Sequence, residues 1–570
     1  MATYNSYIFK LSNFCIVATA LLLTACNDYL DKLPDDRAEL NSEQKVTQLL
    51  VSAYPSQNNH VMMELSSDNV GDNGRSYSSP IICDDYYKFK DTSEESWESP
   101  YNIWNGFYQS VATVNEALYA IDQMGDGDEF RAAKAEAKMI RAYSMFELAI
   151  AFCMAWNEEK ADEYLGLPYP LIPEQDINSK YERGTLRQLY EAIDKDIEEA
   201  LPDIELASQR YKVPKYHFNT KAAYAFAARF NLYYCRYDKA IEYASMALGN
   251  DPTTVMRNYE PYRELGRQDF ANLWIRSDQD ANLMLVVSNS ISSRYLSGGY
   301  SHRWVHNSTM ASYETYWVEM PWGDGSTANS IIYANKLYGT QQCVSFPEYH
   351  EEFEYTDKVA GIGYPHLVES AFTGDMVILE RAEAYALSGQ LDKAMQDCNT
   401  WISTHCKDKV ITDDETGDVS VAPAPVGLTV ADITAFVSGK DYAKRNPDGW
   451  RDRSFRKHMH PQGFTIGEEG SNQECLLQFI LHMKRLETLY HGLRFMDIKR
   501  YGIEYAHQIS GESPIYFIRG DIRGAIQIPQ TVIMAGLEAN PRPTKEEIDK
   551  FVQDTDWEYA DPEDEDEDEE

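Results

Sequence analysis

The sequence is short of positive charge, of paired cysteines and of long hydrophobic runs, and each shortage excludes a class of protein. It has 52 Lys and Arg against 91 Asp and Glu in 570 residues, which gives a formal net charge of −39. An acidic surface of this kind repels phosphate backbones, so we expect no nucleic-acid binding. Beyond the first 25 residues no apolar run reaches the roughly 20 residues that a membrane-spanning helix needs, so we expect no transmembrane helix.

Cysteine spacing and catalytic motifs are also missing. None of the nine cysteines forms a C-x-x-C pair, which argues against a zinc or redox site. Seven of them follow Cys26, an odd number that argues against a full disulfide framework. We expect Cys153, Cys235 and Cys398 to be free thiols within helices. The H-E-x-x-H, G-x-S-x-G, Walker and dinucleotide-binding patterns are absent, so the sequence predicts no catalytic residue, no cofactor and no metal ligand.

The N-terminus carries a short apolar run, residues 14–25, after a polar stretch with one positive charge at Lys10. The run is too short to span a bilayer and has the length of a signal-peptide core. It ends in Leu23-Thr24-Ala25-Cys26, a lipobox pattern, which predicts cleavage after Ala25 and acylation of Cys26, with palmitate as a typical chain. An ordinary secretory signal with a chance cysteine is the alternative. The mature protein would then be attached to a membrane through lipid only.

Helical periodicity dominates the middle of the chain. Thr185 and Gln188 have the spacing of a capping box, and Ala240, Ala247 and Pro252 have the offsets of a tetratricopeptide repeat. The predicted helices at 375–388 and 391–402 form a second helical hairpin of the same kind. The predicted helices cover residues 128–156, 185–201, 219–235, 237–249, 375–388 and 391–402.

Three long segments, residues 55–100, 251–370 and 403–475, are rich in turn-forming residues and have no sustained periodicity, although residues 282–287 are typical of a buried strand. Loops of this length on a rigid scaffold are usually functional. The sequence therefore predicts a mostly α fold, a tetratricopeptide-like helical scaffold with long irregular loop insertions and a few short strands. The last residues, 551–570, are acidic and predicted to be disordered.

Several blocks, in the same order along the chain, resemble the SusD/RagB family of surface lipoproteins of Gram-negative bacteria. The match spans nearly the whole mature chain and departs from the family at Leu489-Tyr490-His491, where an acidic residue is usual. The blocks are Asn27-Asp28-Tyr29-Leu30-Asp31, Trp104-x-x-x-Tyr108 with Asn115, Ile140-Arg141-Ala142-Tyr143, Arg381-Ala382-Glu383-Ala384-Tyr385, Lys484-Arg485-x-Glu487 with Gly492-x-Arg494-Phe495-x-Asp497, and Ile526-Gln527-Ile528-Pro529.

The resemblance implies an outer-membrane lipoprotein that faces the cell exterior, captures an oligosaccharide and delivers it to a SusC-like TonB-dependent transporter. Peptide capture, as in the RagB branch, is the main alternative, and a surface glycosidase is a third. The implied organisation is a signal peptide at 1–25, an N-terminal SusD-like helical region at 26–270, a C-terminal RagB/SusD region on the same scaffold at 271–550, and the acidic tail.

The 484–500 block also has a structural interpretation of its own. Its arginines, lysines and acids alternate in sign at short spacing and can form ion pairs that hold one buried corner. An acid/base pair of Glu487 and Asp497 is the catalytic alternative, and no nucleophile accompanies it.

Aromatic and polar residues in the long loops are the candidate ligand contacts. The chain has 40 Tyr and 10 Trp, and sugars pack their C–H faces on such rings while their hydroxyls bind polar side chains. Ordinary packing is the alternative for each aromatic residue, although we expect at least one of the three tryptophans to be exposed. The candidates are Asp72, Asn73, Arg75, Tyr77, Tyr300, Trp304, Trp317 and Trp322.

Overall fold

The computed structural model describes residues 40–554 except 175–179, 263, 297–301, 324–337, 340–341, 407–408, 413–415, 418, 423–424, 426 and 448–451. The predicted signal peptide, the lipidation site Cys26 and the candidate Tyr300 lie outside these residues. In the described part of the chain, no helix combines the length and the apolar character that crossing a membrane requires.

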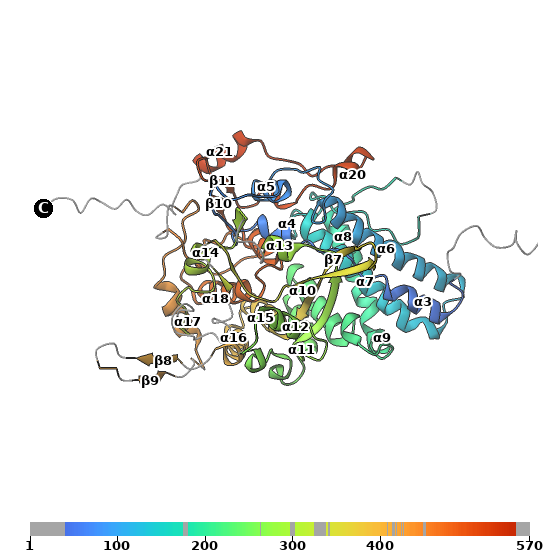
Figure 1. Ribbon diagram of the computed structural model, residues 1–570, viewed down its shortest axis with the longest axis horizontal. Helices are drawn as coiled ribbons and strands as arrows, with labels where there is room; N and C mark the ends of the chain where they lie inside the picture. The colour runs from blue at the N-terminus through green and yellow to red at the C-terminus, as the bar shows by residue number, and fades with distance from the viewer. Residues whose placement is uncertain are drawn as a thin grey trace, which may run out of the picture.

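The N-terminal half is a stack of helices on the right of Figure 1. The predicted capping box is confirmed: the backbone N–H of Gln188 donates to the Thr185 hydroxyl at 3.2 Å, and that of Thr185 donates to the Gln188 side chain at 3.0 Å. The helices of this half are α3 (Glu43–Val51), α6 (Pro100–Gln123), α7 (Arg131–Phe152), α8 (Leu186–Ala200), α9 (Ile204–Ser208), α10 (Thr220–Tyr233) and α11 (Tyr237–Leu248).

Helix α7 is the centre of this stack and packs against both α6 and α8. Its alanines, among them Ala135, Ala142 and Ala149, are buried, and their small side chains let the neighbouring helices approach closely. The predicted bounds of this helix were too wide. A 3₁₀ turn at Asp128–Phe130 precedes it, Asp128 does not cap it, and Cys153 ends it in an extended conformation before Trp156.

Five helices continue the scaffold in the C-terminal half: α15 (Gly374–Leu387), α16 (Leu391–His405), α17 (Val430–Ser438), α18 (Asn472–Glu487) and α19 (Leu493–Tyr501). The repeat-like pairs α10–α11 and α15–α16 are distant in sequence, yet α11 packs directly on α15. The fold is therefore the predicted one, a tetratricopeptide-like helical scaffold in which the two halves share a core. Gly492 enters α19 at φ 73°, and a Cβ there would lie 2.7 Å from Met63 Cβ, so the block needs glycine at this point.

The inserted segments contain more regular structure than their sequence predicts. The strand at 282–287 is confirmed as β2 (Asn282–Ser288), which pairs with β7 (Ile362–Thr373) and through it with β6 (Glu351–Asp357) in one antiparallel sheet. Short pairs join β1 (Gly71–Asp72) with β3 (Trp304–Val305), β4 (Tyr338–Gly339) with β5 (Val344–Ser345), β8 (Lys409–Thr412) with β9 (Val419–Ala422), and β10 (Tyr505–His507) with β11 (Ile515–Phe517).

The remaining helices are short, and the first of them is buried. They are α4 (His60–Leu65), α5 (Ile81–Tyr87), α12 (Arg267–Trp274), α13 (Ser292–Leu296), α14 (Ser308–Tyr313), α20 (Gln530–Met534) and α21 (Lys545–Asp554). Helix α21 corrects one boundary, because residues 551–554 are helical although the acidic tail was predicted to be disordered from 551.

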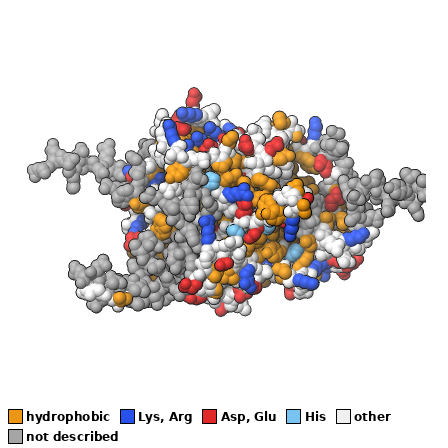
Figure 2. Space-filling view, viewed as in Figure 1, with side chains coloured by type: hydrophobic (Ala, Val, Ile, Leu, Met, Phe, Trp, Pro, Cys, Tyr) orange, Lys and Arg blue, Asp and Glu red, His pale blue; other side chains and the backbone are white. Residues whose placement is uncertain are grey.

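Two surface features stand out. The β8–β9 hairpin projects from the body of the molecule (Figure 1). Hydrophobic side chains gather over the β6–β7 hairpin (Figure 2), where Phe353, Tyr355 and Ile362 are all exposed.

The seven cysteines in the described residues are free thiols, as predicted. Of the three expected within helices, only Cys398 lies in one, because Cys153 follows the end of α7 and Cys235 lies in the turn after α10. Cys153 and Cys398 are buried in the core, while Cys235 is half-buried.

Candidate ligand-binding site

A cavity of about 130 Å³ lies where four segments that are far apart in the sequence meet. That volume holds several water molecules, which a ligand could displace. We call it the junction pocket. Its polar lining comes from Asp68, Asp72, Tyr87, Asn307, Thr309, Glu314, Lys444, Arg445, Arg453, Lys457, Tyr505, His507 and Gln508.

Asp72 reaches the pocket because β1 pairs with β3, which places Asp72 opposite Trp304. Its carboxylate accepts two hydrogen bonds of 2.8 Å from Arg303 and one of 2.7 Å from the backbone N–H of Ser510. Burial raises the pKa of Asp72, but the bonds from Arg303 and Ser510 lower it more, so the group stays ionised. Asp72 is thus a fixed anion at the pocket wall.

The other candidates of the first loop hold loops together rather than line the pocket. Asn73 donates to the carbonyl oxygens of His302 and Gln342 at 2.9 and 2.8 Å. Arg75 donates to the carbonyl oxygens of Ser510 and Gly511, each at 2.7 Å. Tyr77 is half-buried beside this loop. Of these four candidates, the structure brings only Asp72 to the pocket.

Two of the three tryptophans are core residues, which corrects the expectation that they contact ligand. Trp304 is 2% exposed, stacks on Tyr87 with ring centroids 4.0 Å apart, and donates its indole N–H to Asp84. Trp322 is 3% exposed and packs against Trp401 and Phe479. Neither ring has a face free for a sugar. Trp317 is half-buried against the core and is the one of the three with accessible surface, but it does not line the junction pocket.

Behind the pocket lies a buried network that we call the cation-rich cluster, made of Asp68, Glu314, Arg453, Lys457, Arg485 and Arg494. Asp68 accepts two hydrogen bonds of 2.7 Å from Arg494, and Arg485 lies 3.4 Å away.

Glu314 is the second anion of this cluster. It binds Lys457 and Arg453, both at 2.8 Å, and Arg485 at 3.3 Å. Four cations therefore surround two carboxylates, and Arg453 and Lys457 themselves line the cavity.

The surplus of positive charge lowers the pKa of both acids in the cluster. Burial raises the pKa of both acids, but the neighbouring cations outweigh it. Lys457, Arg485 and Arg453 lower the pKa of Glu314 to about 2, and Arg485 and Arg494 hold the pKa of Asp68 well below its usual range. Both carboxylates are ionised at neutral pH. Two positive charges thus remain uncompensated within the cluster, in a protein whose net charge is −39.

The 484–501 block is buried, as its sequence predicts, but of its charged residues only Lys484, Asp497 and Arg500 share one corner. Arg485 and Arg494 pair instead with acids of the cation-rich cluster. Lys484 contacts Glu383 at 2.5 Å and Asp497 at 3.0 Å, and Arg500 contacts the same two acids at 2.8 and 3.2 Å. This corner is balanced in charge. Glu487 contacts none of these residues and instead accepts from Trp401, so Glu487 and Asp497 belong to different clusters and do not form an acid/base pair.

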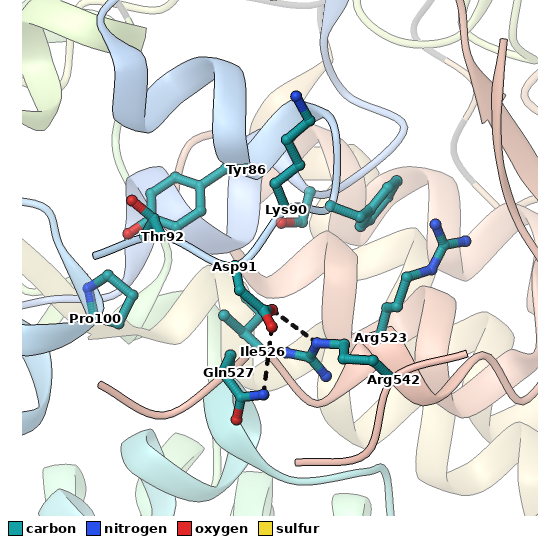
Figure 3. A pocket seen from close by; sticks show the side chains of 11 residues that line it. Tyr86, Lys90, Asp91, Thr92, Pro100, Arg523, Ile526, Gln527 and Arg542 are labelled. Carbon is teal, nitrogen blue, oxygen red and sulfur yellow. Dashed lines mark hydrogen bonds and ion pairs between the residues drawn. The ribbon is translucent and has the colours of Figure 1, made fainter. Parts of the chain in front are cut away.

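A second hollow, between α5 and the segment before α20, has a volume of about 20 Å³. Asp91 accepts a hydrogen bond of 2.7 Å from Arg542 and one of 3.4 Å from Gln527 across it (Figure 3). Its polar groups bind one another, and it has room for about one water molecule. It is too small for a sugar ring.

Sequence reasoning missed Asn307, Arg453 and Lys457 as pocket residues. A usable signal was present, because residues 444–457 contain Lys444, Arg445, Arg451, Arg453, Arg456 and Lys457 within an otherwise acidic chain. The high tyrosine and tryptophan content, by contrast, suggested Trp304 and Trp322 as ligand contacts, and both are buried in the core.

Comparison with known proteins agrees with this architecture. A SusD-like family model, described as starch-binding and associating with the outer membrane, matches residues 28–232. No curated protein sequence matches the chain.

Solved structures match over nearly the whole length. A SusD superfamily protein from Bacteroides thetaiotaomicron has a TM-score of 0.55 at 17% identity, and the match covers 89% of this chain and all of that one. A SusD superfamily protein from Bacteroides fragilis has a TM-score of 0.54 at 15% identity, with 87% and 99% covered. A SusD-like carbohydrate binding protein from Bacteroides vulgatus has a TM-score of 0.52 at 14% identity, with 88% and 97% covered. Residues 28–232 therefore match the SusD-like family model, and the described residues have the fold of SusD superfamily structures.

Proposed function

We propose that the protein is a non-catalytic surface receptor that captures a glycan in the junction pocket. The observation that carries this proposal is the composition of the pocket. Fixed amide, hydroxyl and charged groups from four separate segments converge on one cavity, as recognition of a ligand rich in hydroxyls requires. The family model's description and the carbohydrate-binding relative support a sugar as the ligand.

The charge of the pocket narrows the class of glycan. Arg453 and Lys457 line the cavity and belong to a cluster with two surplus positive charges. A carboxylate or sulfate on a sugar unit would form charge-assisted hydrogen bonds there. Asn307, Thr309 and Gln508 would bind the neighbouring hydroxyls. We therefore propose an acidic glycan rather than a neutral one.

The same electrostatics argue against hydrolysis. A glycosidase needs one carboxyl group that is protonated near neutral pH, beside a second that is ionised. Of the acids lining the pocket, Asp68, Asp72 and Glu314 all have a lowered pKa. None of them would serve as the general acid.

Location and partner follow from the family and the sequence. The family model is described as associating with the outer membrane, and the lipobox at Cys26 would supply the anchor. We propose that the receptor faces the cell exterior and passes its glycan to a SusC-like TonB-dependent transporter. Fractionation of a Cys26→Ala variant tests the anchor: the protein should leave the outer-membrane fraction, and unchanged retention without acyl label would refute lipidation.

Calorimetric titration of the protein from residue 27 onward, against matched neutral, uronate-containing and sulfated oligosaccharides, tests the ligand. We expect binding of an acidic glycan that Arg453→Ala weakens about tenfold or more, the loss typical of a charge-assisted contact. Arg131→Ala, which removes an arginine of the exposed Arg131–Asp203 pair on the helical stack, is the matched control and should leave affinity unchanged.

Three outcomes would count against the proposal. Equal binding of neutral and acidic glycans would refute the role of the charge surplus. Binding of acidic peptides without any glycan would favour the RagB-type alternative. Release of shortened sugars from a bound glycan would establish a glycosidase.

A further inference from the structure

Three buried side chains from three helix ends meet away from the junction pocket. Asp375 lies in the first turn of α15, His405 is the last residue of α16, and Glu487 is the last residue of α18. The side chains of Asp375 and His405 are fully buried and that of Glu487 is 4% exposed. One ligand-type atom from each lies within 4.8 Å of the other two. We call these residues the helix-end cluster.

The distances fit a common metal ion. His405 Nε2 lies 3.3 Å from a Glu487 oxygen and 3.6 Å from Asp375 Oδ1. Zinc binds imidazole nitrogen and carboxylate oxygen at about 2.0–2.2 Å, so tetrahedral ligand atoms are separated by roughly 3.3–3.6 Å. The two distances from the imidazole are therefore those of ligands that share one ion.

The histidine is oriented as a metal ligand would be. His405 Nδ1 lies 2.9 Å from the carbonyl oxygen of Trp401, which can accept a hydrogen bond from it, and 2.9 Å from the Thr404 hydroxyl. In the tautomer that donates to the carbonyl, Nε2 presents its lone pair to the two carboxylates. The ring is also fixed by stacking on Trp401, with centroids 4.0 Å apart. A backbone carbonyl that accepts from the far ring nitrogen is the usual support of a metal-binding histidine.

Each carboxylate has a support of its own. The indole N–H of Trp401 donates to Glu487 at 3.2 Å, and the backbone N–H of Arg257 donates to Asp375 Oδ1 at 3.0 Å. The other oxygen of Asp375, Oδ2, is buried without a hydrogen-bond partner. Among the described residues, no lysine or arginine forms a salt bridge with either acid. The buried guanidinium of Arg257 also acts on Asp375, so the two carboxylates and this cation leave one negative charge beside His405, which a metal ion would neutralise.

We propose that Asp375, His405 and Glu487 bind one divalent transition-metal ion of the zinc type, which fastens the ends of α15, α16 and α18 together. The imidazole ligand favours zinc or a similar ion over calcium or magnesium, which prefer oxygen ligands only. Water would complete the coordination. The site is structural, since it is enclosed by the scaffold. The sequence predicted no metal ligand, because the three residues are far apart in the chain and match no spacing motif.

Metal analysis and cobalt spectroscopy test the proposal on the protein from residue 27 onward, prepared without a histidine tag. We expect about one zinc equivalent per chain after dialysis. Replacement by Co²⁺ should give the visible absorption of a tetrahedral site. A strong chelator should lower the Tm, and added Zn²⁺ should restore it, because an ion that binds only the folded state stabilises that state.

Two variants separate the metal from a merely structural role. His405→Gln and Glu487→Gln should each lose the cobalt absorption, and their Tm should no longer respond to chelator. His458→Gln, which alters a histidine on the loop near Glu469, is the control and should retain both responses. If either cluster variant fails to fold, the cobalt spectrum of the wild-type protein still decides.

Absence of bound metal, no tetrahedral cobalt spectrum and a Tm indifferent to chelator would overturn the proposal. The three side chains would then be joined by a proton on His405 instead.

Discussion

The last turn of α18 supplies residues to two buried clusters of opposite charge, and comparing them shows how one helix serves two purposes. Arg485 enters the cation-rich cluster, where four cations surround two acids, while Glu487 enters the helix-end cluster, where two acids face one histidine. Residues two apart on a helix point about 200° away from each other, so the two groups face different neighbours.

The clusters differ in what can neutralise them. The cation-rich cluster borders a cavity of about 130 Å³, so its surplus is available to a ligand that arrives from solution. The helix-end cluster is enclosed, and we propose that an ion bound within the folded protein neutralises its remaining negative charge. Lys484, which directly precedes Arg485, enters a third cluster whose charges balance. All three clusters are buried, but only the cation-rich cluster and the helix-end cluster have unbalanced charge, and these are the two places where we propose binding.

Asp68→Ala should produce the largest effect, because it deprives Arg485, Arg494 and Lys457 of a shared anion. Removing one partner of a buried ion pair typically costs about 3–5 kcal/mol, since it leaves uncompensated buried charge. Urea denaturation should show a loss of that size. Asp203→Ala, which removes the acid of the exposed Arg131–Asp203 pair, should cost less than about 1 kcal/mol. Equal losses in the two variants would show that the cluster's surplus charge has no energetic weight.

Glu314→Gln should change how stability depends on pH. The pKa of Glu314 is about 2 in the folded protein and about 4.5 when unfolded. Because the folded pKa is depressed, the stabilisation is present above about pH 4.5 and is lost as the pH falls toward 2. The shift corresponds to roughly 3 kcal/mol at neutral pH. Chemical denaturation from pH 3 to 7 should therefore show a smaller rise in stability for the variant than for the wild-type protein.

Glu98→Gln is the matched contrast, because burial raises the pKa of Glu98 to about 7 and it accepts only from neutral groups, Ser290 and the backbone of Ile291. Ionising this acid penalises the folded state as the pH rises from 4.5 to 7. The variant should thus gain stability relative to wild type as the pH rises from 4.5 to 7, whereas Glu314→Gln should lose stability relative to wild type as the pH rises from 2 to 4.5. The same direction in both variants would contradict the assignment of surplus charge to the cluster around Glu314.

Local signals in the sequence predicted the scaffold well, because helices depend on short-range spacing. The capping box at Thr185 and the strand from Asn282 were confirmed for this reason. The pocket could not be predicted in the same way, since β1, α14 and β10 meet through contacts between distant segments.

The tryptophans show that sequence periodicity also fails to predict which side chains are exposed. Trp304 sits in a segment without helical periodicity, yet Tyr87 and Asp84 from α5 bury it. A missing pattern in sequence indicates irregular backbone and does not indicate exposure. Charge would have been the better guide to the pocket, because the basic residues at 444–457 contrast with an acidic chain.

Truncation after Tyr559 should have the smallest effect and tests whether the protein fills its own cation-rich pocket. It removes the acidic end of the chain, residues 560–570, and like charges of this density cannot bury enough apolar surface to fold. We expect an unchanged Tm and unchanged affinity for an acidic glycan. Truncation after Thr544 is the comparison, since it also removes α21 and the contact of Phe551 with Arg519 at 5.9 Å, and should lower the Tm slightly. The contrary result for truncation after Tyr559 is a lower Tm together with tighter glycan binding, the gain in affinity being larger at low salt than at high salt. That result would show that the acidic tail competes with the glycan for Lys444 and Arg453.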